Sequence, residues 1–231
     1  VMWRHEDFWR VLGGGIDFYT GAPLEEYDQS KQATDPRMVT FPLSPLMHGG
    51  AQAGLLMHLF AGHLTILEPK FDPVRTWQII DDERVQLIFM TGDAMARPLI
   101  EAYEEGGFDG SSLFAISSSA AIFSPPVKER WMAAFPDAVF TDSIGASETG
   151  FQGMGLQDRD NISPDGPVVG LGPHSVVIDE DNRVLDVATD IGKIGRLGRG
   201  GSVPVGYYKD PAKSAATFLT IGGERYSVPG D

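Results

Sequence analysis

The sequence predicts an α/β protein, in which a parallel twisted sheet flanked by helices is followed by a smaller, β-rich, barrel-like subdomain. Between residues 38 and 146, short apolar runs alternate with helical segments of about ten or more residues, which is typical of parallel β-α-β units. After residue 150 the helical periodicity fades and glycine becomes more frequent. We therefore expect residues 1–150 to form the α/β subdomain and residues 151–231 to form the β-rich one.

Five apolar runs have strand character and supply the expected parallel sheet, which extends to about Ile144. They are residues 39–43, 64–67, 86–90, 113–117 and 138–140. The helices expected between them are residues 50–61, a helix starting at Asp72-Pro73, residues 93–105 and residues 124–135. Asp72 is a good N-cap, and Pro73 fits a first turn that needs no N–H. Pro98 should bend the third helix or mark its true first turn.

The two ends of the chain have weaker patterns. Residues 4–12 have helical spacing and end at three glycines, while residues 20–37 are polar and predict a surface loop. Residues 175–178 and 183–185 flank an acidic stretch, 179–182, which predicts a hairpin turn. The acids could also suggest a calcium loop, but the spacing of such a loop is absent. Residues 192–208 resemble short barrel strands, and residues 211–218 predict a helix.

Composition restricts the function. The chain of 231 residues carries 18 Lys and Arg against 32 Asp and Glu, a net charge of −14, which argues against nucleic acid or an anionic membrane as partner. It has no cysteine, which excludes thiolate catalysis and suits a reducing cytoplasm, the expected location. No apolar run is long enough to span a bilayer. The first residue is Val1 rather than an initiator Met, so we expect a piece of a longer protein.

Ligands of open α/β sheets bind at the carboxyl ends of the strands. There the run 142–150 presents a hydroxyl, Ser147, beside a carboxylate, Glu148. A hydroxyl can donate to a phosphate oxygen, and a carboxylate can hold Mg²⁺, which bridges phosphates and neutralises their charge. The stretch therefore predicts a nucleotide site, with an ordinary polar loop as the alternative.

Four short motifs, which occur in the same order as in a known family, carry a resemblance to that family. Pro45-Leu46-Met47-His48 resembles a Pro-Leu-Phe-His motif, Ser119-Ala120-Ala121 a Gly-Ala-Ala adenine loop, and residues 144–148 a Tyr-Gly-x-Thr-Glu motif. Residues 206–211, 217–218 and 230–231 match late Gly-Tyr…Thr and Thr-Gly-Asp signatures. The chain thus resembles the adenylate-forming acyl-CoA synthetases, a superfamily that includes luciferases and peptide-synthetase adenylation domains. Its first five residues are similar to the stretch that follows the glycine-rich phosphate loop in actinobacterial-type fatty-acid and steroid-acid CoA ligases.

The resemblance implies an ATP- and Mg²⁺-dependent enzyme that activates a small-molecule carboxylic acid as acyl-adenylate and transfers it to CoA. It implies that Glu148 ligates the metal and that Ser147 contacts a phosphate. The implied nucleotide-binding residues are Ser119, Ala120 and Ala121 flanking adenine, Asp142 and Ser143 accepting from its amino group, Ile144 and Gly145 beside it, and Asp231 accepting from the ribose.

On the acyl side, the resemblance places His48 at the junction of the acyl pocket and the nucleotide, as a third candidate catalytic residue after Ser147 and Glu148. The implied pocket consists of Met47, His48, Gly49 and Gly145, and an apolar chain is expected to run between the helix at 50–61 and the sheet. The acyl substrate itself and the oligomeric state are not predicted.

Three departures from the family pattern affect these expectations. Ile144 replaces the aromatic residue that stacks on adenine, Ser119 replaces a glycine, and Pro229 replaces a threonine. The resemblance also places the family's phosphate loop before Val1 and its catalytic lysine after Asp231. We therefore expect these 231 residues to be inactive by themselves.

Two other functions compete with this interpretation. Residues 145–149 nearly form the nucleophile elbow of a serine hydrolase, although Thr149 stands where the second glycine should be and only His174 follows as a histidine partner. A non-catalytic nucleotide-binding module is the other alternative, and it would never release pyrophosphate.

Overall fold

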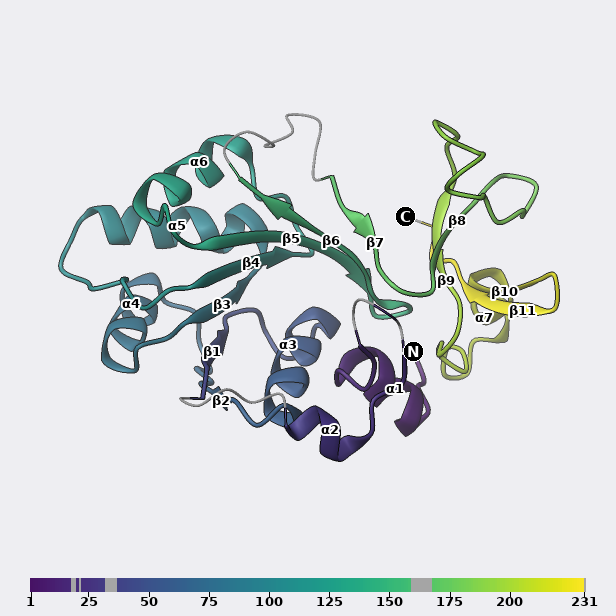
Figure 1. The fold of residues 1–231 in the computed structure, drawn as a ribbon, viewed down its shortest axis with the longest axis horizontal. Coiled ribbons are helices and arrows are strands. Elements are labelled where there is room, and N and C mark those ends of the chain that lie inside the picture. The colour runs from purple at the N-terminus through teal and green to yellow at the C-terminus, as the bar shows by residue number, and fades with distance from the viewer. Residues whose placement is uncertain (18–19, 21, 32–36, 159–167, 231) are drawn as a thin grey trace.

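The structure, a computed structural model, describes residues 1–17, 20, 22–31, 37–158 and 168–230. The described residues form two sheets (Figure 1). The first has seven strands in the order β2-β1-β3-β4-β5-β6-β7, and the second has four in the order β10-β11-β9-β8. The chain is therefore α/β with a separate antiparallel sheet, as the sequence predicts.

The parallel part of the first sheet comes from five strands. They are β1 (Val39–Pro42), β2 (Leu64–Thr65), β3 (Leu87–Met90), β4 (Ala115–Ser119) and β5 (Val139–Ala146). All neighbouring pairs among them are parallel, which confirms the predicted sheet. Strand β4 begins two residues later than expected, because Leu113 is still in a turn in which its N–H donates to the carbonyl of Gly110.

Helices occupy both faces of this sheet. They are α3 (Gly49–Phe60), α4 (Pro73–Asp82), α5 (Gly92–Glu104) and α6 (Pro125–Ala134). Figure 1 shows α5 and α6 on one face and α3, with α1 (His5–Leu12), on the other. The side chain of Asp72 accepts from Arg75 N at 2.8 Å, which confirms the predicted start of α4. Pro98 lies inside α5 rather than in its first turn.

An aromatic cluster joins α4, α5 and α6. Trp77 and Trp131 are fully buried, and the ring of Trp77 stacks on that of Phe135 with centroids 5.7 Å apart. Each indole N–H donates to a carbonyl of α5, Trp77 to Leu99 at 2.7 Å and Trp131 to Ala96 at 2.9 Å. Because a buried indole N–H requires a partner, these bonds fix how the three helices pack and hold the parallel strands in place.

The first sheet continues past residue 150. Strand β6 (Gly150–Gln157) pairs antiparallel with β5, and β7 (Gly170–Leu171) pairs antiparallel with β6. A tight turn reverses the chain after β5, so the division expected at residue 150 falls inside a hairpin of the first sheet. The second sheet begins only at Ser175.

The second sheet is antiparallel throughout its described pairs. It contains β8 (Ser175–Ile178), β9 (Arg196–Arg199), β10 (Phe218–Ile221) and β11 (Glu224–Ser227). Helix α7 (Pro211–Thr217) agrees with the predicted helix, and the side chain of Asp210 caps it by accepting from Lys213 N. The expected run of short strands at 192–208 is reduced to β9 alone among the named strands.

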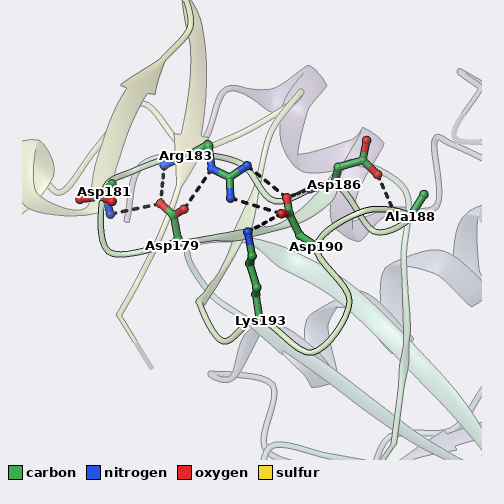
Figure 2. A network of polar contacts seen from close by, with 7 residues as sticks. All are labelled: Asp179, Asp181, Arg183, Asp186, Ala188, Asp190 and Lys193. Carbon is green, nitrogen blue, oxygen red and sulfur yellow. Dashed lines mark hydrogen bonds and ion pairs between the residues drawn. The ribbon is translucent and has the colours of Figure 1, made fainter.

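The acidic stretch after β8 forms the predicted turn. Asp179 Oδ1 accepts from the backbone N–H groups of Asp181 and Arg183, and Arg183 also bridges the carboxylates of Asp179 and Asp190 (Figure 2). Lys193 pairs with Asp190 at 2.7 Å. Lys193, the backbone N–H of Asp186 and Arg183 lower the pKa of Asp190. The acids thus serve an ion-pair network, and the described residues include no group of three or more acids and histidines able to hold a metal.

The predicted surface loop at 20–37 contains a short helix, α2 (Glu26–Ser30), which the sequence interpretation missed. A tertiary contact explains it, because Gln29 is buried, accepts from Trp9 Nε1 at 2.8 Å and donates to the Gly13 carbonyl. No helix in the described ranges is both long and apolar enough to cross a membrane.

Candidate functional site

The turn between β5 and β6 carries Ser147 and Glu148. Thr149 closes it, because its Oγ1 accepts from Ala146 N at 3.0 Å while its own N–H donates to the Ala146 carbonyl at 3.1 Å. Gly150 follows with φ +67°, a conformation that glycine adopts without strain. Thr149 is fully buried by these contacts, whereas Ser147 is exposed and Glu148 half-buried. The turn therefore presents a hydroxyl and a carboxylate at the carboxyl end of β5.

Glu148 is held from the second half of the chain. The phenol of Tyr207 donates to Glu148 Oε1 at 2.6 Å. Tyr207 is fixed in turn, since its N–H donates to Ser214 Oγ at 2.8 Å and its ring contacts that of Phe218. Burial and, as the next largest cause, the bond to Glu148 raise the pKa of Tyr207. The phenol is therefore a neutral donor at physiological pH. Sequence reasoning quoted Tyr207 only as part of a late motif and missed this contact.

The first residues of the chain also reach the turn. Trp3 Nε1 donates to the Ser147 carbonyl at 3.0 Å. Met2 forms an antiparallel bridge with Gly206, in which Met2 N donates to Gly206 O and Val205 N donates to Met2 O, both at 2.8 Å. The segment 1–3 therefore connects the β5–β6 turn to the loop that precedes Tyr207. Sequence reasoning missed Trp3, and a lone indole near the start of a chain gives no signal that would have found it.

Asp142 has a partner that its sequence motif did not indicate. Its Oδ2 forms a 2.5 Å ion pair with Lys128 Nζ of α6, and both residues are buried. Ser143, the next residue of β5, donates to the Ser118 carbonyl at 3.4 Å. Any adenine contact from Asp142 would have to share its carboxylate with Lys128, and its predicted role stays a prediction.

The loop after β4 is braced by the start of α5. Asp93 accepts from Ser124 N at 2.8 Å and from Ser124 Oγ at 2.6 Å, and its own N–H donates to the Ile122 carbonyl. Gly92 permits this approach, since an added Cβ would lie 2.4 Å from Ile122 O.

Within this braced loop, Ala120 has φ +65°, an uncommon and strained conformation for alanine, and it is exposed together with Ala121, while Ser119 is half-buried. The predicted adenine loop is thus a rigid, accessible stretch of backbone beside β5.

The predicted acyl-side residues lie at the start of α3. His48 is its exposed N-cap residue, and Met47 before it is 83% exposed. A Cβ added to Gly49 would lie 3.5 Å from Ser147 Oγ, so this end of α3 adjoins the β5–β6 turn. The structure therefore brings His48 and Gly49 together with Ser147.

Gly145 is exposed, and its predicted place in the pocket stays a prediction. An added Cβ would lie 2.4 Å from Gly150 O, so the backbone of β6 leaves no room for a larger residue at this position. Ile144 is half-buried next to a register shift between β5 and β6. Asp231 lies outside the described residues.

The site can accommodate a magnesium nucleotide. Mg²⁺ keeps several waters and binds proteins through one or two carboxylates plus substrate phosphates. Glu148 supplies one such carboxylate at a partly open turn, with the Ser147 hydroxyl next to it. The exposed backbone at Ala120 and Ala121 lies at the same edge of the sheet, one strand away.

Comparison with known proteins identifies the family. Residues 1–208 match the family described as AMP-binding enzyme. This chain belongs to that family. It is 47% identical over 239 residues to the 3-oxocholest-4-en-26-oate–CoA ligase of Rhodococcus rhodochrous, covering all of this chain and 43% of that protein. It is also 35% identical to the medium-chain acyl-CoA ligase Mig of Mycobacterium avium, covering 42% of it.

Solved structures show the AMP-binding fold at lower identity. The N-terminal subdomain of NpsA from Klebsiella oxytoca, in complex with 3-hydroxyanthranilyl-AMSN, has a TM-score of 0.70 at 22% identity, covering 84% of this chain and 51% of that one. A putative long-chain-fatty-acid CoA ligase from Rhodopseudomonas palustris has a TM-score of 0.67 at 22% identity, covering 89% and 49%. The chain thus spans less than half the length of the curated relatives above.

Membership of the AMP-binding family rules out the serine hydrolase. The structure gives the physical reason, because a nucleophile elbow joins a strand to a helix, whereas Ser147 lies in a turn between two antiparallel strands.

Proposed function

We propose that this chain is part of an AMP-forming acid–CoA ligase, which activates a fatty or steroid-derived acid as acyl-adenylate and transfers it to CoA. The observation that carries the proposal is the β5–β6 turn, where Ser147 and Glu148 stand between the start of α3 and the Tyr207 hydroxyl. The relatives named as acid–CoA ligases, which match over the whole of this chain, support the same reaction.

The nucleotide lies along the carboxyl edge of the sheet in this proposal. The backbone at Ala120 and Ala121 flanks adenine, and the Ser147 hydroxyl donates to a phosphate oxygen. Glu148 holds Mg²⁺, which when bound neutralises charge on the phosphates. Attack by the substrate carboxylate on the α-phosphorus expels pyrophosphate, and fixed donors that position both reactants supply much of the rate.

The acid approaches from the start of α3. Its carboxylate must reach the phosphates near Ser147, so its tail has to leave past Met47, His48 and Gly49. The exposed, apolar side chain of Met47 at the start of α3 suits an apolar tail. The names of the relatives give two classes of acid as candidate substrates, fatty acids and steroid-derived acids.

Pyrophosphate release by the intact enzyme tests the proposal. With ATP and Mg²⁺, release should require a carboxylic acid, and a panel of medium-chain, long-chain and steroid-derived acids would rank the substrates. Binding of ATP without acid-dependent pyrophosphate release would favour the non-catalytic nucleotide-binding module instead.

The isolated chain of 231 residues should behave differently. Adenylation needs a cradle for the β- and γ-phosphates and a cation on the developing charge as well as the metal ligand. Removing one such stabilising group costs about 10²–10³ in rate. We therefore expect no detectable pyrophosphate release from these residues alone, and robust acid-dependent release would show that the essential groups lie elsewhere.

The location of the protein in the cytoplasm stays a prediction, which fractionation of the source cells would test.

A further inference from the structure

A cluster of buried polar atoms lies on the second sheet, away from the nucleotide site. Arg199, at the end of β9, is paired on one side with Ser175 of β8 and on the other with Ser227 of β11. Residues directly opposite each other on antiparallel strands point their side chains to the same face, with Cβ atoms about 4.5–5.5 Å apart. The side chains of Arg199 and the two serines therefore leave the same face of three neighbouring strands.

All three side chains have buried polar atoms that lack partners. Arg199 Nε, Ser175 Oγ and Ser227 Oγ are enclosed, and none has a hydrogen-bond partner among the described residues. Arg199 is 2% exposed and Ser227 is 0% exposed. Buried polar groups in native proteins are almost always satisfied, so three neighbouring exceptions on one face require an explanation.

Arg199 is also a buried cation without an acidic partner. Its Nη1 donates to the Phe151 carbonyl of β6, but no ion pair within the described ranges includes it. Burial lowers the pKa of Arg199 to about 10, so it still carries its charge at neutral pH. Since a buried charge is normally paired, the missing component of this cluster is an anion.

An opening leads to Arg199, the member of this cluster that lines it. Arg199 lines a cleft of about 380 Å³ together with Arg10, Glu6, His174 and Ser202. Glu6 is the one acid among the lining residues, and it lies 3.8 Å from Arg10 Nη2 rather than beside Arg199. Arg10 is itself occupied, because its Nη1 donates to the carbonyls of Gly15 and Leu24. Among the two lining arginines, Arg199 is therefore the one that has no acidic partner within the described residues and that a small anion would pair with.

We propose that Arg199, Ser175 and Ser227 form a binding site for a small oxyanion, a phosphate or a carboxylate, reached from this cleft. The guanidinium supplies the charge and the planar donors that match an oxyanion, and each hydroxyl supplies one further donor. The site is separate from the Ser147–Glu148 turn and does not depend on the adenylation chemistry.

Thermal unfolding of the chain in a chloride buffer tests the site, with inorganic phosphate and acetate titrated in separate arms at matched ionic strength. A ligand that binds only the folded state raises the midpoint, by roughly 5–10 °C for a chain of this size at about 100 times its dissociation constant. The arm with the larger gain at equal concentration identifies the source of the oxyanion. No gain with either anion beyond that of chloride would overturn the proposal.

Variants separate this site from other anion effects. Arg199→Met, which keeps the apolar stem, and Ser227→Ala should each lose the gain. Two variants should keep it in full: Arg196→Met, which removes a half-buried arginine of the same strand that donates to Asn182, and Ser147→Ala, which alters the nucleotide site. If Arg199→Met fails to fold, Ser227→Ala decides alone, because removing an orphaned hydroxyl should not harm the fold. An equal gain in Ser227→Ala and the parent chain would contradict the site.

Discussion

The phenol of Tyr207 donates a 2.6 Å hydrogen bond to Glu148 Oε1, across 59 residues of sequence and between the two sheets. In the proposed role of Glu148 as a metal ligand, Oε2 is the oxygen for which the metal would not compete with the phenol. The position of the Glu148 carboxylate therefore depends on the position of the loop at 204–207. Groups that orient a metal ligand in this way commonly matter almost as much as the ligand itself.

Replacing Tyr207 by phenylalanine in the intact enzyme removes this bond and keeps the ring packed on Phe218. We expect the Mg²⁺ concentration for half-maximal pyrophosphate release to rise, or the rate to fall, by about 10–100-fold, as for other outer-shell partners of metals. Tyr208→Phe is the matched control, because that side chain is 71% exposed and should change neither quantity. An unaltered Mg²⁺ dependence in Tyr207→Phe would argue against a positioning role.

The variant Glu148→Gln tests the metal ligand itself. Its amide oxygen can still accept from Tyr207, so the fold and its thermal midpoint should hardly change, while the loss of charge weakens Mg²⁺ binding. We expect acid-dependent pyrophosphate release to fall by about 10²–10³, the usual cost of one electrostatic group. Release at the parent rate across the Mg²⁺ range would refute the assignment.

The two glycines of the predicted pocket should respond differently to a methyl group. In Gly145→Ala the new Cβ would meet Gly150 O at 2.4 Å, so β5 and β6 must separate and we expect a loss of about 1–3 kcal/mol in the free energy of unfolding. In Gly49→Ala the nearest atom is Ser147 Oγ at 3.5 Å, an ordinary contact, and the stability should stay close to that of the parent. Denaturant titration of both variants measures the difference, and equal midpoints would contradict it.

A larger residue at the same position tests the acyl path. Gly49→Leu places an isobutyl group beside Ser147, and the intact enzyme should then accept shorter acids than the parent does. Pyrophosphate release with acids of increasing length gives the profile, for which Gly50→Leu is the control, because a Cβ at Gly50 meets nothing within 4 Å. The same profile in all three enzymes would count against the path.

The buried pair Lys128–Asp142 should be costly to break from one side. In Lys128→Met the carboxylate of Asp142 stays buried without its cation, and breaking such pairs costs about 3–5 kcal/mol in the free energy of unfolding. Arg130→Met, two residues along on the same helix, breaks a partly exposed pair with Glu104 and should have little effect. Asp142→Asn combined with Lys128→Met should recover part of the loss. If Lys128→Met unfolds at the parent midpoint, the pair does not stabilise the fold.

Local patterns in the sequence were sufficient for the parallel half of the molecule. The apolar runs at 39–43, 86–90 and 138–140 alternate with helices, and crossover rules then impose parallel pairing. Asp72-Pro73 and the acidic turn at 179–182 were predictable for the same reason, because caps and turns are satisfied within a few residues. The motif at 144–148 placed Ser147 and Glu148 at the correct edge of the sheet.

What the sequence by itself determined, then, is the alternation of strands and helices up to β5, the family and the sheet edge at which the site is proposed. Only the tertiary structure decided that β6 and β7 extend the first sheet, that Lys128 pairs with Asp142 of β5, and that Tyr207 and Trp3 reach the β5–β6 turn. The reason is physical: hydrophobic period and capping act over a few residues, whereas these contacts join segments 14 to 144 residues apart. Such pairings depend on how whole elements pack, and no local pattern records that.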